Sequence, residues 1–237
     1  GDFSGYSDMA IGMSRLFGFN LTQNFSSPYF SRNIAEYWNR WHITFSTWLR
    51  DYLYIPIGGN KGAFLMQVRN LYFVFIISGF WHGASWNFVV WGLLNASFFI
   101  PLIIRKRFLK IGKRTRVVAE GKVFPSIKEC LSMVTTFVLI LITRVFYRTE
   151  NIAGAYQYLN KILSKSLFSS FENVPFVTLI LVFFFLVVEW FGREDQYAIE
   201  KIGLGWNRSI RLSFYYLLIF VVFYFTGEKQ DFIYFQF

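Results

Sequence analysis

The stretch that decides the fold, residues 69–105, reads RNLYFVFIISGFWHGASWNFVVWGLLNASFFIPLIIR. Between its two terminal arginines, His82 is the only side chain that can carry a charge near neutral pH. A helix needs roughly 20 apolar residues, at about 1.5 Å each, to cross a bilayer core of about 30 Å. The run is too long for one ordinary crossing, so it predicts two membrane-spanning helices joined near residues 81–87.

Three further apolar runs, at residues 131–147, 174–191 and 212–226, each end in charged or amide residues. Over its 237 residues the chain is 54% hydrophobic and 16% charged, whereas about a quarter of the residues of a soluble domain are charged. No tandem repeat or low-complexity linker divides the sequence. We therefore expect residues 1–237 to form a single membrane domain, an all-α, polytopic bundle of transmembrane helices with re-entrant or interfacial helices.

The first 68 residues interleave glycine, asparagine, serine and aromatic residues with charged ones. Residues 35–53 contain no proline or glycine and predict a helix, but they carry too many charges to face lipid, so we expect an interfacial helix or one packed inside the bundle. Residues 54–62, YIPIGGNKG, predict a turn or a re-entrant loop, because Pro56 biases Ile55 away from helix and the glycines tolerate positive φ. Residues 151–171 suit an outer loop or a short surface helix.

The net charge of +10 does not indicate a nucleic-acid partner, because of where the charge lies. Basic side chains crowd residues 105–122, directly after an apolar run, as the positive-inside rule expects of a cytoplasmic loop. With residues 105–129 inside, alternation places residues 150–173 outside, residues 192–208 inside and residues 232–237 at the outer face. Membrane lipid is the expected partner, and nucleic acid is not.

His82 is the first candidate for chemistry, because an ionisable side chain is costly at the depth of an apolar segment. Neutral imidazole can take a proton from a hydroxyl group and return it later. Trp81, Trp86 and Asn87 offer polar groups from a largely apolar wall. The residues alone leave two interpretations open: His82 is a base that lines a cavity, or it merely bonds a neighbouring helix or anchors the membrane interface.

His42 is the only other histidine. It lies forty positions from His82, with no cysteine or carboxylate at a familiar ligand spacing, so the sequence predicts no metal site and favours a substrate-facing polar helix. Near it, Arg40, Arg50 and Asp51 would need mutual pairing if they were buried, which favours a salt-bridge network over direct catalysis.

Other familiar chemistry is not indicated by the sequence. Cys130, the only cysteine, could carry an acyl group as a thioester, but nothing in its sequence neighbourhood activates it, so a packing role is favoured. The sequence contains no nucleophile elbow, phosphate-binding loop or dinucleotide fingerprint.

Three ordered motifs resemble the membrane-bound O-acyltransferase family, and within it the bacterial alginate O-acetyltransferase type. They are DFSGYSDMAIG at residues 2–12, EYWNRWHITFSTWLRDYLYIPIGG at residues 36–59 and SGFWHGASWNFVVWG at residues 78–92, and the closing FIYFQF is also similar. At position 39 this family customarily has an aromatic or basic residue, whereas this chain has Asn39. The family's N-terminal spans are missing, so we expect the chain to correspond to the C-terminal portion of such a protein.

The resemblance implies a helix bundle with a tunnel that reaches a central catalytic histidine, which falls on His82. His42 falls on the second motif histidine and is the other catalytic candidate. Along the tunnel the resemblance and the sequence together place Trp81, Trp86, Asn87, Trp41, Arg40 and Asp51.

The same resemblance implies acyl transfer in the bacterial inner membrane. The acyl group, acetyl by analogy, would come from acetyl-CoA or another cytoplasmic thioester, with no tightly bound cofactor and no metal. It would reach hydroxyl groups of an extracytoplasmic, alginate-like polysaccharide directly or through periplasmic partner proteins. The alternative is a polysaccharide export subunit, in which the polar residues line a permeation path.

Overall fold

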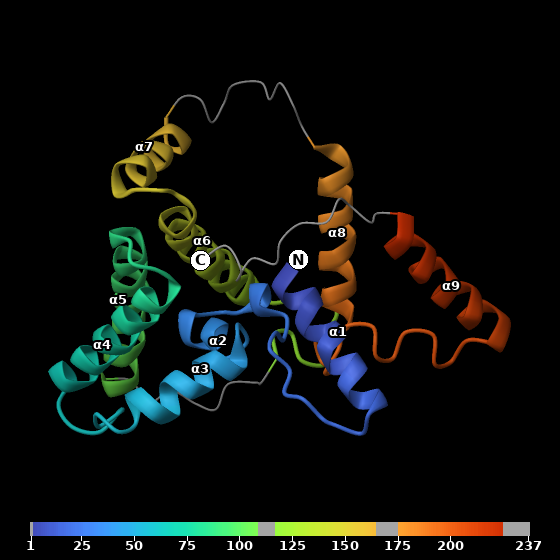
Figure 1. Cartoon of the computed structure of the whole chain (residues 1–237), viewed down its shortest axis with the longest axis horizontal. Coiled ribbons are helices and arrows are strands. Elements are labelled where there is room, and N and C mark those ends of the chain that lie inside the picture. Colours follow the sequence, from blue (N-terminus) through green and yellow to red (C-terminus); the bar gives the residue numbers. More distant parts are fainter. Residues whose placement is uncertain (1, 109–116, 165–174, 225–237) are drawn as a thin grey trace.

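The computed structural model describes residues 2–108, 117–164 and 175–224, and within these ranges all regular structure is helical (Figure 1). The longer helices are α1 (Asp2–Leu16), α4 (Phe64–His82), α5 (Trp86–Phe108), α6 (Ile127–Arg148), α7 (Ile152–Ile162), α8 (Phe176–Phe191) and α9 (Arg208–Tyr224). The shorter ones are the 3-10 helix η1 (Pro28–Phe30), α2 (Ile34–Trp38), α3 (Ile43–Leu49) and the π-helix η2 (Arg50–Tyr54). The predicted all-α class is confirmed.

Helices α4, α5 and α6 are long and apolar enough to cross a membrane, judged by length and composition. Because α4 ends at His82 and α5 begins at Trp86, the predicted division of residues 69–105 into two helices is confirmed. The predicted run at residues 131–147 lies within α6. The last two runs correspond to α8, a shorter apolar helix, and to α9, and residues 174, 225 and 226 of those runs lie outside the described ranges.

Glycines allow α4 and α5 to pack closely as an antiparallel pair. A Cβ atom at Gly79 would overlap the carbonyl group of Phe88, and one at Gly92 would overlap the carbonyl group of Phe75. Two backbones can approach this closely only where no side chain intervenes, as in the small-residue interfaces of membrane helices. The pair therefore forms a rigid hairpin whose bend lies between His82 and Trp86.

The single helix predicted over residues 35–53 is wrong, because the chain breaks between α2 and α3. His42, at the break, has a left-handed backbone with φ 45° and ψ 56°. The backbone carbonyl of Asn24 accepts a hydrogen bond from the N–H of Ile43 (2.9 Å), and its side-chain oxygen accepts from the N–H and the hydroxyl of Thr44 (3.2 and 2.7 Å). A segment distant in sequence thus satisfies the first donors of α3 and makes the break stable.

The turn predicted at residues 54–62 is confirmed, and its three glycines have positive φ. Buried Asn70 of α4 donates a hydrogen bond to the carbonyl of Gly59 (3.1 Å) and so fixes the turn against the helix that follows. The expectation that Pro56 moves Ile55 out of the helical region is wrong, since Ile55 has φ −65° and ψ −47°. Its N–H still donates to a carbonyl of η2 at 2.9 Å.

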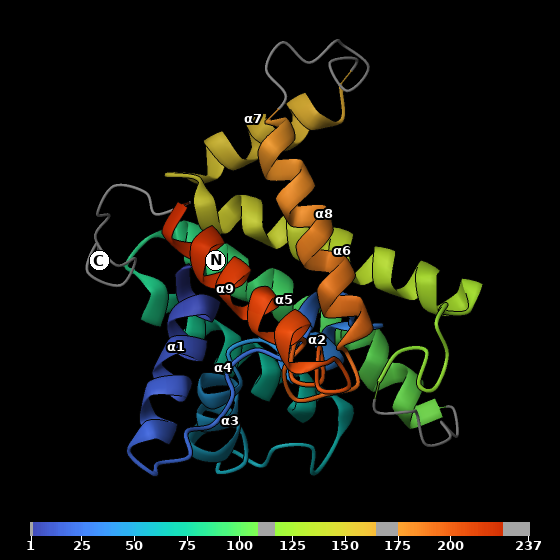
Figure 2. The ribbon, with the colours of Figure 1, turned by 90° about the vertical axis from the view of Figure 1, so that its right-hand side faces the viewer.

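The short helix α2 lies at the centre of the packing, against α5 and α6 (Figure 2). Its buried residues Ile34 and Tyr37 contact Ile140 of α6. Partly buried side chains complete this cluster: Trp38, Trp41, Phe98, Phe99 and Leu102. The core is therefore built mainly from aromatic rings, and it holds the break at His42 beside the bend between α4 and α5.

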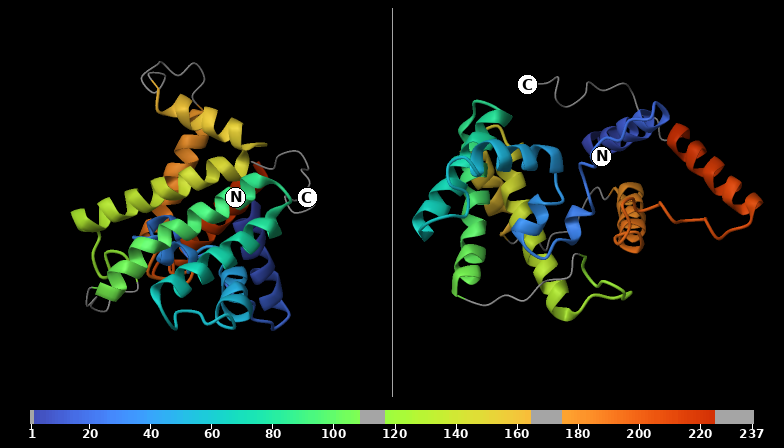
Figure 3. Two further views of the ribbon diagram at one scale, coloured as in Figure 1. Left: turned by 90° about the vertical axis from the view of Figure 1, so that its left-hand side faces the viewer. Right: turned by 90° about the horizontal axis from the view of Figure 1, so that it is seen from below.

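Helices α8 and α9 lie on the opposite side of the molecule from α4 and α5 (Figures 1 and 3). Buried Arg193, just after α8, donates to the carbonyls of Val118 (3.0 Å) and Ala119 (2.8 Å), which precede α6, and its guanidinium lies 4.2 Å from the Trp190 ring centre.

The surface helix predicted within residues 151–171 is confirmed as α7, while residues 165–171 lie outside the described ranges.

Candidate active site at the junction of α4, α5 and α6

His82 is the last residue of α4, where the chain bends toward α5. The bend uses Gly83, whose φ of 151° is rarely adopted by other residues, and the Phe88 ring lies where a side chain at Gly83 would start. The Nδ1 atom of His82 lies 3.2 Å from the hydroxyl of Tyr147 on α6. In the part of the chain that the structure describes, Nε2 has no hydrogen-bond partner, so one ring nitrogen is engaged and the other is available.

Aromatic rings surround the half-buried imidazole of His82. Ring centres lie at 4.8 Å for Trp81, 5.0 Å for Tyr147, 5.1 Å for Trp91 and 6.1 Å for Phe88. Trp91 and Tyr147 present their rings nearly perpendicular to the imidazole, the edge-to-face arrangement that aromatic pairs prefer. These contacts restrict the orientation of the ring, as a proton-transfer group requires.

His42 lies near His82 but does not contact it. Two rings connect them: Phe45 stacks on His42 with a centre distance of 5.0 Å, and Trp81 lies 4.4 Å from Phe45 and 4.8 Å from His82. Burial lowers the pKa of His42 to about 4, so its ring is neutral near pH 7. His42, Phe45 and Trp81, with Phe3, Thr44 and Trp48, line a cavity of about 450 Å³.

Asn87 connects the start of α5 to the end of α6. Its side-chain amide is buried and donates to the backbone carbonyl of Thr149 and, at 3.4 Å, to the Thr149 hydroxyl. Its Oδ1 atom is buried without a hydrogen-bond partner among the described residues. Trp86, one position earlier, is 73% exposed and makes no ring contact within the described ranges. Asn87 therefore holds helices around His82, whereas Trp86 stands apart from it.

Of the expected mutual pairing of Arg40, Arg50 and Asp51, the Arg50–Asp51 pair is present, whereas Arg40 belongs to a different ion-pair network. Arg40 pairs with Glu36 at 3.1 Å, and Glu36 also pairs with Arg32 at 3.1 Å. Asp51 pairs with its neighbour Arg50 at 2.7 Å on the surface. The reason is the break after α2, which separates Arg40 from η2.

Arg144 and Tyr147, one turn apart on α6, are the site residues that the sequence analysis missed. Arg144 donates a hydrogen bond to the hydroxyl of Tyr37 (3.1 Å), and its guanidinium lies 4.3 Å from the ring centre of Trp41. Trp41 also stacks on Tyr37, so it belongs to the α2–α6 core. A charge inside the apolar run 131–147 was a signal for Arg144, whereas no signal marked Tyr147.

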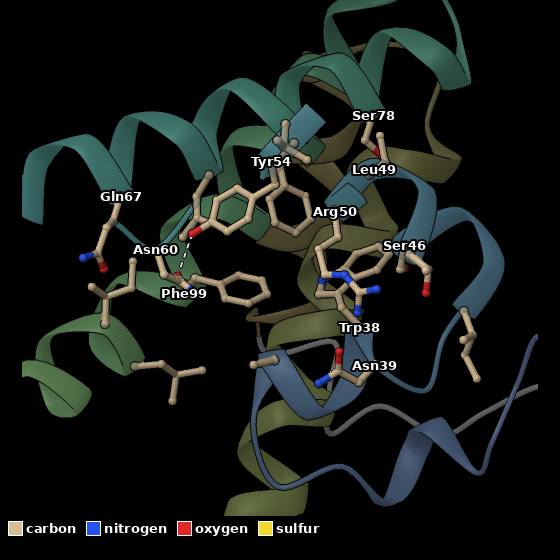
Figure 4. Close-up of a pocket in the computed structure, with 18 residues that line it drawn as sticks. Trp38, Asn39, Ser46, Leu49, Arg50, Tyr54, Asn60, Gln67, Ser78 and Phe99 are labelled. Atoms are coloured by element: carbon tan, nitrogen blue, oxygen red, sulfur yellow. Dashed lines mark hydrogen bonds between the residues drawn. The ribbon is translucent and has the colours of Figure 1, made fainter. Parts of the chain in front are cut away.

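A larger cavity of about 730 Å³ lies between α2, α3, η2, α4 and α5 (Figure 4). Gln67 and Ser78, both on α4, line it at positions eleven residues apart, which is about 16 Å along a helix. Arg50 projects into it in Figure 4. Neither histidine lines this cavity, but Ser78 lies one helical turn before His82. The cavity therefore extends along α4 almost to the candidate site.

Comparison with known proteins adds independent information. A family model described as "MBOAT, membrane-bound O-acyltransferase family" matches residues 1–124. A probable alginate O-acetylase of Azotobacter vinelandii is 36% identical over 204 residues, 83% of this chain and 38% of that protein. A probable alginate O-acetylase of Pseudomonas putida is 33% identical over 261 residues, 100% of this chain and 50% of that protein. A peptidoglycan O-acetyltransferase of Helicobacter pylori is 43% identical over 158 residues, 67% of this chain and 28% of that protein. The chain thus spans half or less of the length of these curated relatives.

Proposed function

The chain belongs to the membrane-bound O-acyltransferase family, and on that premise we propose that it transfers an acetyl group from a cytoplasmic thioester donor to hydroxyl groups of an extracytoplasmic polysaccharide. The names of the relatives, which act on alginate and on peptidoglycan, support a glycan acceptor. The observation that carries the proposal is the position of His82. Its Nε2 atom is available at the meeting point of three candidate membrane spans.

In the proposed reaction His82 acts as a general base and then as a general acid. Nε2 takes the proton of the acceptor hydroxyl, and the oxygen attacks the thioester carbonyl carbon. The tetrahedral intermediate collapses with cleavage of the C–S bond, and Nε2–H returns the proton to the departing sulfur. The products are an O-acetyl ester and a free thiol, with no change of oxidation state. The chemistry is the same whether the hydroxyl belongs to the polysaccharide or to a periplasmic partner protein.

We place the donor in the larger cavity, since its lining leads from the first turns of α4 to within one turn of His82. The start of α4 lies at the same end of the hairpin as the end of α5, which leads into the basic residues 105–122. If that loop is cytoplasmic, the cavity opens toward the compartment that supplies the thioester. Its volume falls within the range of about 300–1,000 Å³ typical of small-molecule sites.

Other predicted site residues take different roles in this proposal. His42, neutral near pH 7, can accept a hydrogen bond from the acceptor in the smaller cavity, which Trp81 also lines. Asn87 fixes the helix ends around His82. Trp41 and Arg40 support the packing of α2, and we assign no contact with substrate to exposed Trp86 or Asp51.

The test is a His82→Ala substitution in the intact protein, with acetyl ester measured on the exported polymer. We expect ester content to fall by a factor of about 100 or more, the typical contribution of a general base, while polymer yield is unchanged. His42→Asn serves as a comparison at the second histidine. Lost export together with normal acetylation of intracellular polymer would instead favour the export function.

A further inference from the structure

Tyr147 makes the one hydrogen bond that the His82 ring forms within the described residues. Its hydroxyl oxygen lies 3.2 Å from Nδ1, and the two rings meet edge to face with a centre distance of 5.0 Å and an angle of 84°. The bond therefore joins the last residue of α4 to the last turn of α6. No carboxylate hydrogen-bonds to His82 among the described residues, so this phenol occupies the position at which many catalytic histidines have an orienting acid.

The direction of this hydrogen bond decides whether His82 can act as a base. A neutral imidazole carries one N–H and one bare nitrogen. If Tyr147 donates to Nδ1, the ring proton is on Nε2, and Nε2 cannot accept another proton from a substrate hydroxyl. If Nδ1–H donates to the Tyr147 oxygen, Nε2 is bare and can accept one. Only the second arrangement is compatible with the proposed reaction.

We propose that Tyr147 is a positioning residue that accepts a hydrogen bond from Nδ1–H of His82 and thereby holds Nε2 as the proton acceptor. The catalytic consequence rests on the proposed function, whereas the tautomer is a property of the folded protein. When Nε2 gains a proton, the ring becomes a cation and the bond from Nδ1–H to the phenol oxygen becomes charge-assisted and stronger. Tyr147 would therefore stabilise the transition state more than the resting state.

Contacts on either side of Tyr147 hold it in place for this role. Arg144, one turn earlier, is fixed by its hydrogen bond to Tyr37 and its stacking on Trp41, and its guanidinium lies 5.6 Å from the Tyr147 ring centre. Two residues later, Thr149 is bound by the Asn87 side chain. Because Arg144 donates its hydrogen bond to Tyr37, it leaves the Tyr147 oxygen available to accept from His82.

The tautomer can be measured directly by ¹⁵N NMR of the histidine rings, of which this chain contributes His42 and His82. The intact protein would be labelled with ¹⁵N-histidine and placed in lipid nanodiscs, and the signals that a His82→Asn variant lacks would be assigned to His82. We expect a protonated Nδ1 and a bare Nε2 in the wild-type ring near pH 7. In Tyr147→Phe we expect the population to shift toward the Nε2–H form, which dominates in free imidazole side chains.

Tyr72→Phe is the matched control, because the Tyr72 hydroxyl also makes a hydrogen bond between two helices, 2.7 Å to Ser97, without contacting a histidine. This variant loses a comparable bond and should leave the tautomer unchanged. A wild-type ring with Nε2–H and a bare Nδ1, or a Tyr147→Phe ring with the wild-type tautomer, would overturn the proposal. Neither result depends on whether the protein transfers acetyl groups.

Acetyl transfer then tests the catalytic consequence. We expect Tyr147→Phe to lower kcat by roughly 10- to 100-fold with little change in KM, because the wrong tautomer removes the base while substrate contacts remain. Tyr72→Phe should retain wild-type kcat. A shifted tautomer with unchanged kcat would contradict a positioning role, and absence of transfer in the wild-type protein would instead contradict the proposed function.

Discussion

His42 carries the clearest pH dependence among the single residues outside the candidate spans. Burial lowers its pKa from 6.5 to about 4 in the folded protein. Between these values the unfolded chain binds a proton that the folded chain does not, so unfolding becomes more favourable as the pH falls. The stability that neutral His42 provides is thus fully present above about pH 6.5 and is lost toward pH 4.

We therefore expect the Tm of the protein in detergent to fall between about pH 7 and pH 5, and to fall less in His42→Asn. Asparagine removes the titrating ring and tolerates the left-handed backbone at this position. Thermal unfolding followed by circular dichroism at each pH provides the measurement. The same decrease in both proteins would show that His42 does not contribute.

The residues of the candidate site were only partly predictable from the sequence. His82 is conspicuous because it interrupts an uncharged run, and the motif pattern around it implied its role. Tyr147 could not be identified, since a tyrosine at the end of an apolar run is ordinary for a membrane interface. Its relation to His82 depends on how α6 packs against the hairpin, across 65 positions of sequence.

At the level of the helices, the close packing of α4 and α5 determines how substitutions of their glycines affect stability. Gly79→Ala or Gly92→Ala would push a methyl group into the backbone of the facing helix. We expect each to lower the free energy of unfolding by about 1–3 kcal/mol, the usual cost of overpacking. Displacement of α5 should also lower acetyl transfer, because α5 carries Asn87 and Trp91 of the site.

Gly12→Ala in α1 provides the matched control, because no atom lies within 4 Å of a Cβ at that position. Alanine is the better helix former by about 1 kcal/mol, so this variant should be neutral or stabilising. Denaturant unfolding of the three variants in one detergent compares them directly. Equal stability of Gly79→Ala and Gly12→Ala would contradict the close approach of the two helices.

Helix boundaries were predictable where they follow from the local sequence. Gly83 and the polar residues near it marked the end of α4, and the glycines of residues 54–62 marked a turn. The break between α2 and α3 was not predictable, because residues 35–53 contain no helix-breaking residue and the acceptors that stabilise the break come from Asn24. Contacts between distant segments overrode local helix propensity there.

The orientation of the whole molecule in the membrane is open to a direct test. With residues 105–129 inside, α7 lies outside and the segment between α8 and α9 lies inside. Leu163, at the end of α7, and Leu204, before α9, are both well exposed and suit single-cysteine labelling in a Cys130→Ser background.

We expect Leu163→Cys to react with a membrane-impermeant maleimide in intact cells and Leu204→Cys to react only after permeabilisation. The opposite pattern would place the basic loop outside and would also remove the argument that the larger cavity opens toward the cytoplasm. Labelling of both positions from one side would contradict the assignment of α8 as a span.

The two cavities have no lining residue in common, and α3 with the end of α4 lies between them. Trp81 and Phe45, in contact with each other, line the smaller cavity together with His42. A protein that draws one reactant from each side of a membrane risks conducting protons and ions along the same route. Cavities that share no lining residue, and that His82 does not line, would leave packed side chains across this route and so preserve the electrochemical gradient of the membrane.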